Sequence, residues 1–97
     1  VIQPPSECEK LELLGPGDPS SRHASFDWTD MSERLKRRDK PFCQSKATEI
    51  VLRAGEVLYL PSFWFHFIVS LDQSVQCNMR SGRGSAGEKD ISRCGFF

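Results

Sequence analysis

AGEVLYLPSFWFH, residues 54–66, joins a turn, an apolar run, a proline break and a second apolar run. Residues 54–56 have the composition of a turn, residues 57–60 that of a short strand, and Pro61 interrupts the chain before the next run. That next run, residues 63–71, is apolar on both of its alternating faces. A strand of this kind is buried on both sides, as in a sandwich or a filled barrel.

Outward from this stretch, residues 48–53 and 74–79 are also rich in β-branched and apolar residues, so we expect barrel strands across residues 48–79. Residues 1–47 are polar and rich in proline and glycine, and they predict loops with one short helix within residues 27–38. Thr29 or Asp30 is expected to cap that helix. We expect residues 81–97 to form an irregular C-terminal tail whose terminal aromatic residues pack back.

Composition excludes some functions. The 97 residues make one small domain at most, and 13 Lys and Arg balance 13 Asp and Glu. A nucleic-acid binder normally has a basic excess, so we expect no nucleic-acid partner. No apolar run reaches the roughly 18–20 residues of a transmembrane segment. The basic residues between 34 and 40 are interpreted as a solvated helix face.

The four cysteines, Cys8, Cys43, Cys77 and Cys94, include no C-x-x-C pair, which argues against a zinc ribbon or a thioredoxin-type motif. No secretory signal is visible, so reduced thiols and an intracellular location are favoured over two disulfides. Cys77 is expected to pack in a strand as a small apolar residue. Because the chain begins at Val1 without a methionine, we expect it to be a piece of a longer polypeptide.

His66 is the one ionisable side chain in residues 63–71. A single histidine on an apolar face is more often a hydrogen-bonded core residue than a ligand. From the residues alone, His66 is therefore a candidate metal or acid–base group with a structural alternative beside it.

Residues 54–66 resemble the G-[DE]-x-L-[YF]-[IL]-P-x-x-[WY]-x-H segment of the JmjC and cupin-like hydroxylases, which are Fe(II)- and 2-oxoglutarate-dependent oxygenases built on a double-stranded β-helix. The resemblance implies an all-β fold: the C-terminal half of such a cupin or jelly-roll-like barrel, with one short helix, over residues 1–97. It implies that His66 is the distal iron ligand of a 2-His-1-carboxylate triad. Residues 74–79 resemble the family's next barrel strand, and this resemblance implies that Asn78 lies near the iron and the co-substrate. Residues 2–6 and 21–27 resemble other family segments more loosely.

The sequence departs from this family at the rest of the iron site. It contains no H-x-[DE] pair, and its other histidine, His23, is followed by Asp27 in a segment that resembles a non-ligand loop. We therefore assign no catalytic residue, and Fe(II) and 2-oxoglutarate remain implied by resemblance without being expected in this chain alone.

Two hypotheses about function follow. The chain is either the C-terminal part of an oxygenase that acts on protein side chains, or an inactive structural or interaction subunit of a larger assembly. Half a barrel leaves a β edge open, so in both cases we expect a partner that covers it: the missing N-terminal half or another protein chain.

Overall fold

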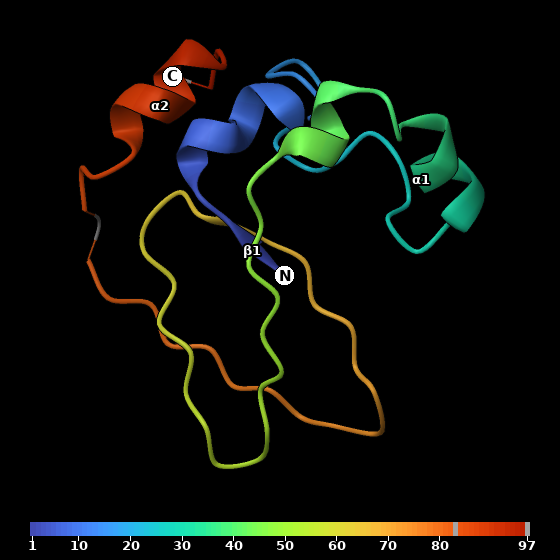
Figure 1. Ribbon diagram of the computed structural model, residues 1–97. Helices are drawn as coiled ribbons and strands as arrows, with labels where there is room; N and C mark the ends of the chain where they lie inside the picture. The colour runs from blue at the N-terminus through green and yellow to red at the C-terminus, as the bar shows by residue number, and fades with distance from the viewer. Residues whose placement is uncertain (83, 97) are drawn as a thin grey trace.

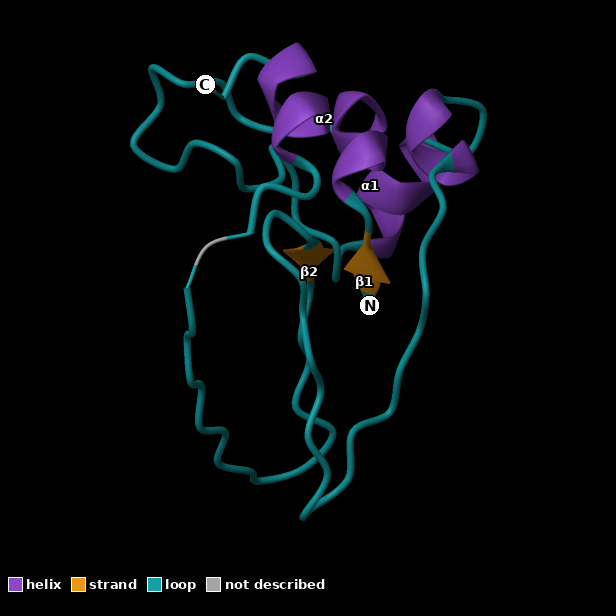
Figure 2. Cartoon of the chain, turned by 90° about the vertical axis from the view of Figure 1, so that its left-hand side faces the viewer, coloured by secondary structure: helices purple, strands orange, loops and turns teal. Residues whose placement is uncertain are grey.

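The computed structural model describes residues 1–82 and 84–96. Its elements gather at one end of the molecule, and long loops run from them toward the other end (Figure 1, Figure 2). In chain order they are strand β1 (Ile2–Gln3), 3-10 helix η1 (Pro5–Lys10), helix α1 (Met31–Lys36), 3-10 helix η2 (Pro41–Gln44), strand β2 (Phe65–His66) and helix α2 (Glu88–Arg93). None of the helices in the described part of the chain is long and apolar enough to cross a bilayer.

Strand β1 is held on both sides. It pairs antiparallel with β2, so that Ile2 lies opposite His66, and Ile2 also exchanges two backbone hydrogen bonds of 2.9 Å with Thr48. Val1 extends the ladder, because its amino group donates to the carbonyl oxygen of Phe67 and its own carbonyl accepts from the Phe67 amide, both at 2.9 Å. The first residues of the chain thus connect two segments that are far apart in sequence.

A small core forms where α2 packs on η1. Leu11 and Ile91 are each only 2% exposed, and Cys8 between them is 5% exposed. A disulfide joins Cys8 to Cys94 over 86 residues of sequence. The expectation of reduced thiols is therefore wrong for this pair, and Cys43 and Cys77 are the free cysteines. No spacing rule could have paired them, because the pairing follows from the docking of two distant helices.

Helix α1 begins where the sequence predicts. Asp30 is its N-cap, and the Asp30 carboxylate accepts hydrogen bonds from the Ser32 amide at 2.9 Å and from the Ser32 hydroxyl at 2.7 Å. At the other end, Arg37 pairs with Glu12 at 2.6 Å and with Glu33 at 2.7 Å. Arg37 thereby connects the helix to the N-terminal segment and is not part of the expected solvated basic face. Most of the neighbouring basic residues are exposed, as expected.

The expected strands of residues 48–79 form only in part. Within the described chain, ladder pairing in that range is limited to β2 and the bridge at Thr48. Val57, Val75 and Met79 are 93%, 94% and 96% exposed. A strand needs a hydrogen-bonded neighbour and an apolar surface to cover its inner face, and these segments have neither within the described residues.

The overall dimensions agree with this open arrangement. The accessible surface is 7807 Å², whereas a compact monomer of this mass exposes roughly 5600 Å². The radius of gyration is 14.5 Å, against about 12.5 Å for a compact chain of this length. Exposed apolar residues of the long loops, such as Val57, Val75 and Met79, contribute to this surface.

The C-terminal segment also differs from expectation. Residues 81–97 were predicted to be irregular, but α2 forms there and buries Ile91 against η1. Phe96 is half-buried, and its amide donates to the Ile91 carbonyl oxygen at 3.4 Å. The expected packing of Phe97 lies outside the described residues.

Candidate functional site

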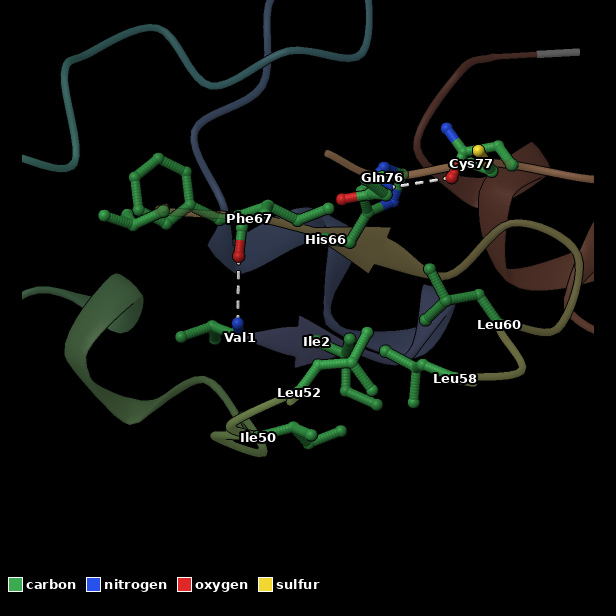
Figure 3. Close-up of a pocket in the computed structure, with 13 residues that line it drawn as sticks. Val1, Ile2, Ile50, Leu52, Leu58, Leu60, His66, Phe67, Gln76 and Cys77 are labelled. Carbon is green, nitrogen blue, oxygen red and sulfur yellow. Dashed lines mark hydrogen bonds between the residues drawn. The ribbon is translucent and has the colours of Figure 1, made fainter. Parts of the chain in front are cut away.

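A cavity of about 190 Å³ opens between β1, β2 and the long loops (Figure 3). Aliphatic side chains line most of it, and a small polar group closes one side. The aliphatic residues are Val1, Ile2, Ile50, Leu52, Leu58, Leu60, Ile68 and Val69. The polar group comprises His66, Gln76 and Asn78, with the Cys77 thiol beside them. An apolar pocket with a few convergent polar groups has the general form of a small-molecule site.

The backbone on both sides of His66 is fastened to the rest of the fold. Residues 65 and 66 form β2, paired with β1, and the next residue, Phe67, lies in a group of aromatic rings. The centroids of Phe67 and Trp28 are 5.4 Å apart, and Trp28 packs edge-on against Phe42 at 5.0 Å. His66 is the exposed residue of this short strand, so its imidazole faces the open pocket while its backbone is held.

Asn78 lies in the same pocket as His66, so the structure brings the two predicted site residues together. The Asn78 Oδ1 atom accepts a hydrogen bond of 2.8 Å from the Gln76 Nε2 atom. Gln76 was missed at the sequence level, although it was detectable: residues two apart in an expected strand share one face. Cys77 was expected to be buried and is exposed instead, because no barrel wall covers it within the described chain.

These residues do not make a complete iron site. Non-haem iron of the facial-triad type needs two histidines and a carboxylate, and this pocket supplies one imidazole. The described residues contain no group of three or more His, Cys, Asp or Glu side chains that could hold a metal ion. The donor set of this chain therefore does not fit a catalytic iron without further ligands.

The His23 and Asp27 side chains are engaged in local turns. The Nδ1 atom of His23 lies 3.1 Å from the Ser20 carbonyl oxygen. The Asp27 carboxylate accepts from the Thr29 hydroxyl at 2.6 Å and from the Thr29 amide at 2.8 Å, and these two bonds hold the pKa of Asp27 below its ordinary value. Neither residue lines the pocket of His66.

A family model that describes a cupin-like domain matches residues 1–79. The chain belongs to this family. The match covers both the pocket and the strands β1 and β2, and it ends before α2. No curated protein and no solved structure matches the sequence.

Membership agrees with the expected barrel family at the level of the cupin-like domain. Helix α2 and Cys94 lie outside the matched residues. The pocket lies wholly within the matched part.

Proposed function

We propose that this cupin-like domain supplies the distal-histidine side of an Fe(II)- and 2-oxoglutarate-dependent oxygenase of the JmjC type, with a protein side chain as substrate. The observation that supports this most is that His66, at the end of the segment that resembles the family motif, lines the same pocket as Asn78. His66 would contribute one imidazole, and the Asn78 amide would face the co-substrate.

The chain alone is not an oxygenase under this proposal, because two ligands of the iron are lacking. They must come from residues that complete the barrel, either elsewhere in the same polypeptide or in another chain. The bound iron and 2-oxoglutarate would supply the oxidative chemistry. The residues of this chain would hold one ligand in a fixed direction and keep an apolar wall against water.

The test uses the polypeptide isolated from its source, whose denatured mass is compared with the 11.0 kDa of this chain. For a longer polypeptide, anaerobic Fe(II) binding and succinate release from 2-oxoglutarate are measured in the wild type, in His66→Ala and in His23→Ala. We expect His66→Ala to lose iron binding and to release succinate only at the enzyme-free rate. His23→Ala is the matched control, because it removes the other histidine outside the pocket, and it should behave as wild type. Full iron binding by His66→Ala would refute the proposed ligand.

A second candidate function is favoured by the exposed surface. The chain exposes 7807 Å², about 2000 Å² above the compact expectation, and a partner in a standard complex covers about 800 Å² on each side. An inactive cupin-like subunit would dock into an assembly through the exposed apolar residues of its long loops, and His66 would then be a structural residue. A source polypeptide of 11.0 kDa that co-purifies in a larger complex without iron would favour this function over the oxygenase.

A further inference from the structure

We propose that the Cys8–Cys94 disulfide is a redox-sensitive crosslink whose reduction loosens the strand that bears His66. It acts through the C-terminal clamp, which we define as residues 84–96. The proposal concerns the order of the backbone at the pocket and does not depend on whether His66 binds iron.

The clamp is attached to η1 by the disulfide and by the packing of α2. Helix α2 has only six residues, whereas isolated helices shorter than about 12–15 residues are marginal in water. Its stability must therefore come from docking, which rests on buried Ile91 and on the covalent bond from Cys94 to Cys8. The Cys8 sulfur also lies 3.5 Å from the Asp90 carbonyl oxygen, so the helix backbone and η1 are in direct contact.

The clamp also contacts the turn before β2. The Gly84 amide donates to the Ser62 hydroxyl at 3.1 Å. Gly87 has a positive φ of 85°, and a Cβ atom at this position would lie 2.5 Å from Pro5 Cγ and 3.7 Å from the Ser62 carbonyl oxygen. Gly87 is thus wedged where η1 and the turn meet, and only glycine fits there.

The backbone of that turn is strained at Phe63. The Trp64 amide donates to the Pro61 carbonyl oxygen at 3.3 Å, and Phe63 has a φ of +68°. A bulky residue in this region is strained and persists only where the surroundings hold it. The turn is held by its contacts with Gly84 and Gly87 of the clamp, and the strand that follows it is paired with β1. Residues 65 and 66 follow at once, so the turn contributes, together with the pairing to β1, to the orientation of the strand that bears His66.

A reductant can approach the disulfide from the side of Cys94, because Cys8 is buried. Cys94 is half-buried, and the disulfide borders an open cavity that Glu9, Glu12 and Phe96 also line. A thiolate of a dithiol reductant attacks one sulfur and displaces the other as a thiolate, and its second thiol then releases the mixed disulfide. Two electrons and two protons pass to Cys8 and Cys94, and the reductant leaves as its own disulfide. The clamp is then held by noncovalent contacts alone.

The test is hydrogen exchange of the wild-type chain, oxidised and after treatment with dithiothreitol, read by mass spectrometry over three peptides. On reduction, we expect amides of residues 61–68 and 88–94 to exchange at least about 10-fold faster, and those of α1 to stay unchanged. Reoxidation should restore protection. Alkylation of the denatured, unreduced chain should count two thiols, from Cys43 and Cys77.

Cys94→Ser should reproduce the reduced state without reductant, and Cys43→Ser, which removes an exposed free thiol, is the matched control. Four thiols in the purified chain would overturn the proposal. So would faster exchange confined to residues 88–94, since the turn would then be independent of the clamp. Loss of protection throughout, α1 included, would also overturn it, because the bond would then stabilise the whole fold. If Cys94→Ser fails to fold, the reduction and reoxidation of the wild type decide the question.

Discussion

Truncation of Leu11 should destabilise the chain far more than truncation of Val75, although both residues are apolar. Leu11 is 2% exposed and lies in the small core between η1 and α2, while Val75 is 94% exposed in a long loop. Leu11→Ala and Val75→Ala therefore compare the truncation of a buried side chain with that of an exposed one. The comparison tests whether the stability of this chain lies in the helical end or in the expected barrel wall.

The magnitudes follow from burial. Removing a fully buried leucine side chain to alanine costs about 2–5 kcal/mol, as lost transfer energy and a residual cavity. A domain of this size is stable by about 5 kcal/mol, so Leu11→Ala should remove roughly half of that or more. Val75 already contacts solvent, so its truncation should change the free energy of unfolding by at most a few tenths of a kcal/mol. In an assembly that covers the same face, the two lost methyl groups would cost about 1.6 kcal/mol.

The assay is urea unfolding of each variant, followed by the fluorescence of Trp28 and Trp64. An unchanged slope with a lower midpoint identifies a change in stability alone. The reasoning is refuted if Leu11→Ala costs less than about 1 kcal/mol, below the range for a buried leucine. It is refuted equally if Val75→Ala costs as much as Leu11→Ala in the isolated chain.

Two other predictions concern Glu7 and Phe63. The Glu7 carboxylate accepts from the Lys46 amide at 2.9 Å and from the Lys10 ammonium at 3.0 Å, and chiefly the first of these bonds holds the Glu7 pKa below its ordinary value of 4.5. Because the pKa of Glu7 is lower in the folded chain, the ionised carboxylate stabilises the fold above pH 4.5. This stabilisation is lost as the pH falls through the folded-state pKa. The urea midpoint should therefore fall more steeply below pH 4.5 in the wild type than in Glu7→Gln, and parallel curves would contradict this. At position 63, the glycine variant should be more stable than the alanine variant by about 1 kcal/mol, because both lose the ring and only glycine relaxes the positive φ. Equal midpoints would argue against strain in the turn.

The sequence predicts local features well where one residue type determines the geometry. Asp30 caps α1 because a carboxylate before the first turn can accept a free amide, and that requires no distant contact. His66, the last residue of the motif, and Asn78, in a later expected strand, line the same pocket. Their roles as an iron ligand and a co-substrate contact remain predictions.

The features that the sequence did not predict depend on distant partners. Helix α2 has one buried residue, Ile91, so it shows no apolar periodicity, and its docking site on η1 lies more than 80 residues away. Residues 57–60 and 74–79 have strand composition, but composition cannot provide the neighbouring strand that a ladder needs. The same absence explains why Cys77 is exposed when its apolar context predicted burial.

The position of β1 has a consequence for the order of folding. Ile2 is synthesised before both of its pairing partners, Thr48 and His66, and Cys8 is synthesised 86 residues before Cys94. Contacts between such distant residues demand the closure of large loops before they contribute stability, which slows folding. Until synthesis passes residue 66, β1 lacks its partner strand β2 and lies beside exposed apolar segments, a state that is prone to aggregation and suited to chaperone binding.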